Sequence, residues 1–191
     1  MEALKQRILR DGRAVNEQIL IVDSFLNHQV DVELMRLVGE AFAERFAQAK
    51  PNRIVTIEAS GIAPAVMTAQ CLKLPMVILK KSTSRVLSDD IVQTEVFSFT
   101  KNAPYQLTLK RQFIENGDRV LLIDDFLANG EAALGACRLI EQAGATVAGI
   151  GAVICKAFQP GLQKLRDQGY NVDALAKIRK MSEGTIEFDE A

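Results

Sequence analysis

The sequence of 191 residues contains no tryptophan, one histidine and three cysteines. Because His28 is alone, metal sites built from clustered histidines are excluded, and a Ser-His-Asp triad is disfavoured. The cysteines Cys71, Cys137 and Cys155 show no metal-ligand spacing, and their odd number without a secretory signal indicates a reducing compartment. We expect all three to be small buried residues without a catalytic or metal-binding role.

Charge of one sign and long apolar runs are also missing. The net charge is −1, so no basic excess supports binding to nucleic acid. No apolar run approaches the roughly 20 residues that a membrane-spanning helix needs, and the first residues are charged, unlike a signal peptide. With 48% hydrophobic residues, the composition predicts a cytoplasmic protein without membrane or nucleic-acid partners, and the length predicts one domain over residues 1–191.

Two common phosphate-binding signatures, the Walker pattern and G-x-G-x-x-G, are absent. Residues 120–132 instead read VLLIDDFLANGEA. Four apolar residues predict a buried strand of a parallel sheet, with Asp124 and Asp125 at its carboxyl end. A loop with Asn129 and Gly130 then leads into a helix that we expect over residues 131–143. Free N–H groups at this helix start, with carboxylates beside them, predict a site for a phosphate and for hydroxyl groups.

A second unit of strand, small-residue loop and helix covers residues 53–73. We expect a strand over residues 53–58, then a loop that contains Ser60 and Gly61, and a helix with Pro64 near its first turn. Two such loops in one sheet imply a ligand with two anionic ends. An ordinary connecting loop that contains glycine would explain either of the two loops alone, but it explains the presence of both loops less well.

The remaining segments predict an α/β protein with a doubly wound sheet. Lys80 and Lys81 follow a predicted strand and precede an exposed polar loop over residues 82–90 that contains Arg85. These cations fit either a solvated edge or a lid over a polyanion. The other expected elements are helices at 2–11, 31–50 and 160–168, strands within 14–22 and at 76–79, 146–155, 173–181 and 185–188, and a hairpin arm over 91–113.

Residues 120–132 resemble the phosphoribosyl diphosphate (PRPP) motif of type I phosphoribosyltransferases, and the resemblance extends over roughly residues 53–158. It implies a mainly parallel, twisted sheet flanked by helices, with a hairpin flexible loop. It also implies a hood over about residues 1–30 above a core over about 31–191. The implied reaction is displacement of diphosphate from C1 of PRPP by a nitrogen base, with Mg²⁺ held mainly by substrate oxygens and water rather than by a protein cage. The resemblance further suggests a homodimer.

The same resemblance implies roles for the residues of both loops. Asp124 and Asp125 face the ribose 2′- and 3′-hydroxyls and favour positive charge on the sugar. Ser60 and Gly61 hold the diphosphate, with Lys81 and Arg85 above it. The 5′-phosphate is bound by the backbone amides of Ala128, Asn129, Gly130, Glu131 and Ala132.

The phosphate loop departs from the family pattern. Many members carry Thr-Gly-Gly-Thr where this chain has Asn129-Gly130-Glu131-Ala132, so phosphate binding must rely on backbone N–H groups. We expect the Glu131 side chain to point to solvent. Ala128 stands where the hypoxanthine-guanine enzymes carry an aspartate proposed as a proton carrier, so we assign no side-chain acid or base.

Lys156 is placed like the lysine that binds O6 in 6-oxopurine phosphoribosyltransferases. A lysine supplies only donors, which matches a carbonyl and rejects the amino group of adenine; the alternative is a solvated lysine at a strand end. Over its whole length the chain resembles the bacterial xanthine phosphoribosyltransferases, especially over residues 18–29 and 128–132. That resemblance implies xanthine contacts from the Asn27 side chain and the Leu20 backbone. By residue type alone, Asn27 suits a turn and Leu20 suits a core position.

Other bases and a regulatory role are the alternatives. Guanine and hypoxanthine share O6 with xanthine, so a hypoxanthine/guanine phosphoribosyltransferase fits Lys156 as well. Adenine is disfavoured by Lys156, and orotate weakly by a hood without a cationic cluster. A non-catalytic PRPP-binding regulator, like some purine-responsive repressors, would need a basic DNA-binding extension, for which the residues ahead of the first loop leave little room.

Overall fold

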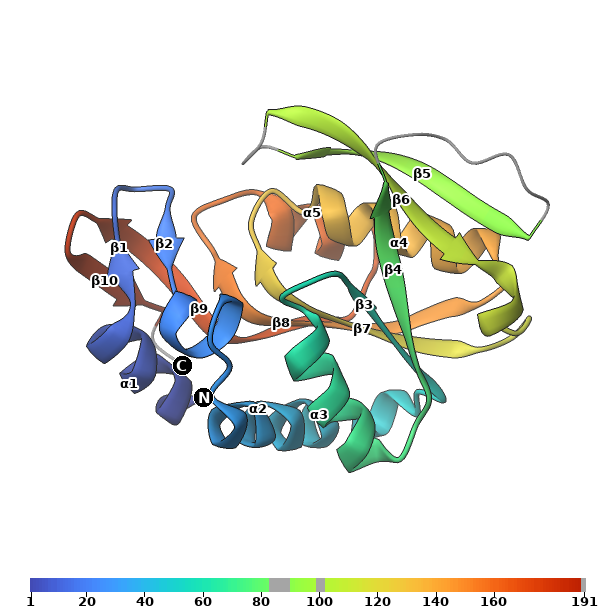
Figure 1. The fold of residues 1–191 in the computed structure, drawn as a ribbon, viewed down its shortest axis with the longest axis horizontal. Helices are drawn as coiled ribbons and strands as arrows, with labels where there is room; N and C mark the ends of the chain where they lie inside the picture. The colour runs from blue at the N-terminus through green and yellow to red at the C-terminus, as the bar shows by residue number, and fades with distance from the viewer. Residues whose placement is uncertain (83–89, 99–101, 190–191) are drawn as a thin grey trace.

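The computed structural model describes residues 1–82, 90–98 and 102–189. Its main sheet consists of β3 (Arg53–Ile57), β4 (Met76–Ser82), β5 (Ile91–Ser98), β6 (Ala103–Lys110), β7 (Arg119–Leu127), β8 (Thr146–Lys156), β9 (Val172–Ser182) and β10 (Thr185–Phe188). The order across the sheet is β10-β9-β8-β7-β3-β4-β6-β5. Strands β9, β8, β7, β3 and β4 are parallel, whereas β10, β6 and β5 pair antiparallel at the two edges. The predicted mainly parallel α/β sheet is confirmed, and β5 and β6 form the predicted hairpin (Figure 1).

Helices cover both faces of the sheet (Figure 1). On one face lie α2 (Val32–Arg45) and α3 (Ile62–Leu72), and on the other α4 (Glu131–Gln142) and α5 (Gly161–Asp167). The buried run of β7 serves both layers, because Leu121 and Ile123 join the core beneath α2 and α3 while Val120 and Leu122 join the core beneath α4. A strand that is buried on both faces therefore explains why this run is continuously apolar.

The first 27 residues form α1 (Glu2–Asp11), β1 (Arg13–Ala14), β2 (Leu20–Ile21) and a π-helix, η1 (Asp23–Asn27). The strand expected within residues 14–22 is therefore much shorter than predicted. The Asn16 side chain accepts hydrogen bonds from the Gln18 and Ile19 amides, both at 2.8 Å, and so turns the chain between the two short strands.

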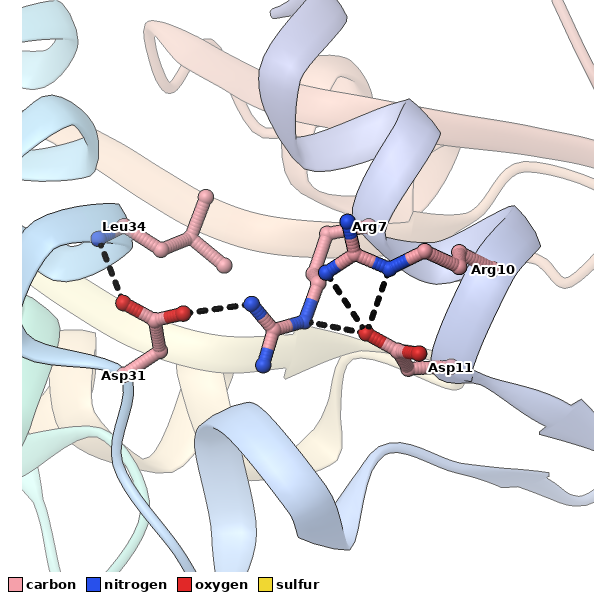
Figure 2. Close-up of polar contacts among 5 residues, drawn as sticks. All are labelled: Arg7, Arg10, Asp11, Asp31 and Leu34. Atoms are coloured by element: carbon pink, nitrogen blue, oxygen red, sulfur yellow. Dashed lines mark hydrogen bonds and ion pairs between the residues drawn. The ribbon is translucent and has the colours of Figure 1, made fainter.

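Arg7 joins this N-terminal segment to α2 (Figure 2). Its guanidinium lies 2.6 Å from Asp11 Oδ2 and 2.5 Å from Asp31 Oδ2, and 5.3 Å from the centre of the Phe25 ring. Asp31 also caps α2, as predicted, by accepting a hydrogen bond from the Leu34 amide at 3.0 Å. The N-terminal segment is thus joined to the start of α2 through the Arg7–Asp31 ion pair, while Asp11 holds Arg7 from within α1.

Two strands extend beyond their predicted ends. β7 continues through the two acids to Leu127 because β8 pairs with it that far, although its pairing with β3 ends at Ile123. β4 continues to Ser82 because Lys80 and Lys81 pair with β6. Lys80 and Lys81 are therefore strand residues, and the loop expected from residue 82 lies mostly outside the described residues.

The cysteines only partly match the expectation. Cys137 and Cys155 are buried thiols, as predicted. The prediction was wrong for Cys71, which is exposed because it lies on the side of α3 away from the buried Ala65 and Ala69. None of the described helices is both long and apolar enough to cross a membrane.

Candidate active site

Asp124 and Asp125 occupy the part of β7 that extends past the end of its pairing with β3. Both are partly buried, and the Asp125 amide donates a hydrogen bond to Asp124 Oδ1 at 3.0 Å. Burial, followed by the charge of Asp125, raises the pKa of Asp124 well above its usual range, while the nearby Lys81 charge opposes this shift. The two acids thus form a like-charge pair at the sheet edge, and a cationic group beside them would be stabilised.

The loop after β7 presents a row of unpaired amide donors. Gly130 has φ +86° and places the chain at the start of α4. The backbone N–H groups of residues 129–133 donate to no acceptor among the described residues. Five free amides at the start of a twelve-residue helix offer the donors that an anion would need.

Gly161 packs against this loop, and it was not identified from the sequence. Its amide donates to the Ala128 carbonyl at 2.9 Å. A Cβ on Gly161 would lie 2.3 Å from that oxygen and 2.6 Å from the Gly130 nitrogen, so only glycine allows this close approach. The Pro160-Gly161 pair at a helix start was the one available signal.

Glu131 does not point freely to solvent, which corrects the expectation. Its Oε1 accepts a hydrogen bond from Lys164 Nζ at 2.8 Å, within an ion pair whose side chains are 33% and 42% exposed. α5 brings Lys164 to this position, and the sequence near Glu131 gives no sign of it.

The loop after β3 is held by Glu58, a residue not assigned to the site from the sequence. The Glu58 carboxylate accepts the Lys81 amide at 2.6 Å and Lys80 Nζ at 2.9 Å. The Glu58–Ala59 peptide bond is cis. The amides of residues 59–61 make no hydrogen bonds to the described part of the chain. A second set of free donors therefore follows β3, in the small-residue loop that the sequence predicts there.

The loop after β3 approaches Asp124 of β7 at Gly61. A Cβ on Gly61 would lie 2.8 Å from Asp124 Oδ1 and 2.5 Å from Thr56 Oγ1, so this loop packs directly against the Asp124 carboxylate. Thr56 is fully buried, and its hydroxyl has no partner among the described residues. Ser60, Gly61 and Asp124 are thus neighbours; Arg85 lies outside the described residues.

Tyr105 on β6 completes this end of the site and was assigned only to the hairpin from the sequence. Lys81 Nζ lies 5.7 Å from the centre of its ring. Burial, and then the negative charge of Asp124, raises the pKa of Tyr105 to about 12. The phenol is therefore a neutral group beside Lys81 and Asp124 at neutral pH.

Lys156 ends β8 and faces the N-terminal segment. Its Nζ donates to the Gln18 carbonyl and lies 5.5 Å from the centre of the Phe126 ring. Partial burial lowers the pKa of Lys156. Lys156 is therefore not a fully solvated lysine, and its contact with a base stays a prediction.

Leu20 and Asn27, the other residues assigned to the base, lie on the hood. Leu20 is buried in β2, and Asn27 is exposed at the end of η1. Within the described residues, no hydrogen bond or ion pair joins Asn27 to Lys156, so their common role stays a prediction. Of the two phenylalanines considered for the purine face, Phe126 lies by Lys156, whereas Phe158 is 42% exposed.

No three His, Cys, Asp or Glu side chains converge as a metal site within residues 1–82, 90–98 and 102–189. Asp124 and Asp125 offer the carboxylate oxygens that Mg²⁺ prefers, but too few to enclose it. The pair fits an ion that takes most of its ligands from a bound substrate and water.

Comparisons with known proteins identify the family. The family described as "Phosphoribosyl transferase domain" matches residues 17–187. The chain is 57% identical over 188 residues to xanthine phosphoribosyltransferase 1 of Clostridium botulinum strain Hall, covering 98% of this chain and 99% of that protein. It is 54% identical to a xanthine phosphoribosyltransferase of Clostridium acetobutylicum, covering 98% of this chain and all of that protein (100%).

Solved structures show the same fold. An adenine phosphoribosyltransferase from Thermoanaerobacter pseudethanolicus aligns with a TM-score of 0.75 at 21% identity, covering 91% of this chain and 99% of that chain. The enzyme from Rhodothermus marinus aligns with a TM-score of 0.74 at 27% identity, covering 93% and 97%. With the acids at the end of β7 and the free amides after it, these matches establish that the chain belongs to the phosphoribosyl transferase domain family.

Proposed function

We propose that this chain transfers the 5-phosphoribosyl group of PRPP to xanthine and releases xanthosine 5′-monophosphate and diphosphate. The observation that carries the proposal is a row of free amides after each of the neighbouring strands β3 and β7, with Gly61 of the first row against Asp124 and Lys156 at the next strand end. A ligand with a phosphate at one end and a diphosphate at the other matches these two rows. The names of relatives at 54–57% identity support xanthine as the base.

The reaction uses the electrostatics of the acid pair. The amides of residues 128–132 bind the 5′-phosphate, and those of residues 60–61, together with Lys81, bind the diphosphate. Asp124 and Asp125 accept hydrogen bonds from the ribose hydroxyls. Positive charge that develops at C1 stabilises two carboxylates whose mutual repulsion is unfavourable in the empty site, so their interaction is strongest in the transition state.

Mg²⁺ fits this site as a cofactor that enters with PRPP. When bound, it neutralises charge on the departing diphosphate. Among the described residues, Asp124 and Asp125 could contribute oxygen ligands, and the remaining ligands would come from PRPP and water.

Base selection depends on Lys156 and the hood. Lys156 donates to O6 of the purine, where an adenine amino group would leave it without an acceptor. The Asn27 side chain and the Leu20 backbone contact the carbonyl at C2 that distinguishes xanthine from hypoxanthine. The adenine enzymes that share the fold do so at identities of 21% and 27%, which carries no argument for adenine.

The enzyme acts as a cytoplasmic homodimer in this proposal. Exposed apolar side chains on the adjacent helices α2 and α3, such as Val32 at 63% and Val66 at 43% exposure, are consistent with a covered surface. Sedimentation of the full chain tests this part separately.

The decisive experiment measures diphosphate release with PRPP, Mg²⁺ and each of xanthine, guanine, hypoxanthine, adenine and orotate. We expect the highest kcat/KM for xanthine, and Asn27→Ala should reduce the preference for xanthine over hypoxanthine. If guanine or hypoxanthine leads, the enzyme belongs to the hypoxanthine/guanine type. If PRPP binds but no base reacts, the chain is a PRPP-binding regulator.

A further inference from the structure

The loop proposed to bind the 5′-phosphate contains a carboxylate, which the anion site must accommodate. Glu131 is the first residue of α4, and its amide is one of the free donors of this loop. An acidic side chain here is favoured by the helix dipole when the site is empty. Once a phosphate binds, the same carboxylate repels it unless its charge is compensated or held away.

α5 supplies that compensation. The start of α5 is packed against the loop through the hydrogen bond from Gly161 N–H to the Ala128 carbonyl at 2.9 Å. One turn later, Lys164 Nζ lies 2.8 Å from Glu131 Oε1. The side chains of this pair are only partly exposed, at 42% and 33%, so its effect on a neighbouring anion is less screened than that of a fully solvated pair.

We propose that Lys164 is a positioning residue for the 5′-phosphate, because it holds the Glu131 carboxylate against α5 and cancels its charge beside the anion site. Lys164 acts through Glu131 and does not itself touch the phosphate. This inference rests on the proposed role of the loop over residues 128–132. Because a partly exposed ion pair contributes little to stability, its main consequence is expected in PRPP binding rather than in the melting temperature.

The test is a double-mutant cycle with Lys164→Gln, Glu131→Gln and the double variant. Lys164→Gln should raise the KM and Kd for PRPP by about threefold to tenfold, with kcat within about twofold, since the uncompensated carboxylate repels the ligand. Glu131→Gln alone should leave PRPP binding equal or slightly tighter. The double variant should return to within about twofold of the wild type, because no charge is left to compensate.

Ligand fragments and salt locate the effect. Binding of ribose 5-phosphate should weaken as much as that of PRPP in Lys164→Gln, whereas binding of free diphosphate should not change. Raising the ionic strength should reduce the difference. A matched control is Arg179→Gln, which breaks the 2.9 Å ion pair with Glu187 at the far edge of the sheet and should leave PRPP binding unchanged.

Three results would overturn the proposal. In the first, Lys164→Gln binds PRPP as tightly as the wild type. In the second, the double variant binds PRPP as weakly as Lys164→Gln, which would mean that Lys164 binds the phosphate directly. In the third, binding of free diphosphate weakens as much as binding of ribose 5-phosphate. Because PRPP and ribose 5-phosphate binding are measured by calorimetry, the outcome does not depend on turnover. A chain that binds PRPP but converts no base would contradict the proposed function and leave this inference testable.

Discussion

Substitution of Gly61 by alanine should disable the active site while the protein remains folded. Gly61 has φ −68°, which alanine adopts without strain, so the cost comes from the added methyl group. That methyl would lie 2.5 Å from Thr56 Oγ1 and 2.8 Å from Asp124 Oδ1, where ordinary contact begins near 3.4 Å. Thr56 is fixed in the buried strand β3, so relief of its contact displaces residue 61 and its loop by about 0.9 Å, and the loop and the Asp124 carboxylate must also move about 0.6 Å apart. A displacement approaching 1 Å at a reacting centre costs up to about a hundredfold, so kcat/KM for PRPP should fall by about tenfold to a hundredfold.

The assay pairs steady-state kinetics with thermal unfolding, and Gly149→Ala is the matched control. A Cβ on Gly149 would lie 2.6 Å from the Phe46 ring, in the core beneath α2 and away from both loops. Overpacking should cost it about 1–3 kcal/mol, or a few °C in Tm, with kcat/KM unchanged. If Gly61→Ala keeps wild-type kcat/KM, or if Gly149→Ala loses activity to the same extent, then proximity of Gly61 to Asp124 does not control catalysis.

Further substitutions test the acid pair, the base site and the hood. Burial and the charge of Asp125 raise the pKa of Asp124, so its carboxyl group keeps a proton in the folded chain at pH values where the unfolded chain has lost it. The stability of the folded state therefore falls as the pH rises from about 3.8 towards the folded pKa. Asp124→Asn should therefore melt above the wild type at pH 8, with the difference vanishing towards pH 4 in calorimetric scans, while kcat falls by about a hundredfold or more. Lys156→Met should lower kcat/KM for xanthine by about a hundredfold at unchanged KM for PRPP. Burial lowers the pKa of Lys156, so the KM of the wild type for xanthine should begin to rise at a lower alkaline pH than the KM of Lys156→Arg for xanthine. Arg7→Met removes the contacts with Asp31 drawn in Figure 2 and should raise the KM for xanthine by about threefold to tenfold with kcat preserved; an equal rise in the KM for PRPP would contradict a specific effect on the hood.

Local patterns predicted the architecture because each depends on a short stretch of chain. The apolar run at residues 120–123 indicated a strand buried on both faces, and the alternating layers confirm it. Asp31 was predicted to cap a helix, and its side chain accepts the Leu34 amide. Short strands were harder, because the side chain of Asn16 interrupts the predicted strand through a local turn that competes with pairing.

Side-chain partners could not be predicted because they come from distant segments. Lys164 is 33 residues from Glu131, and Lys80 is 22 residues from Glu58. Hydrophobic periodicity fixes which face a residue occupies, but it gives no register between strands or helices. Gly161 illustrates the same limit, since its importance follows from one close approach to Ala128 that no local pattern encodes.

The different lengths of three neighbouring strands determine the order in which the free amides, the carboxylates and Lys156 lie along the sheet. Thr56 of β3, Ile123 of β7 and Gly151 of β8 lie at the same level of the sheet, yet β3 ends one residue later, whereas β7 continues to Leu127 and β8 to Lys156. At about 3.3 Å per residue, β7 and β8 project roughly 10 Å or more beyond β3. The loop after β3 therefore reaches Asp124 from the side, and Lys156 stands farthest along the sheet, next to the hood. A ligand along this edge meets free amides, then carboxylates, then a lysine, which is the order of groups that the proposed contacts with diphosphate, ribose and a 6-oxopurine require.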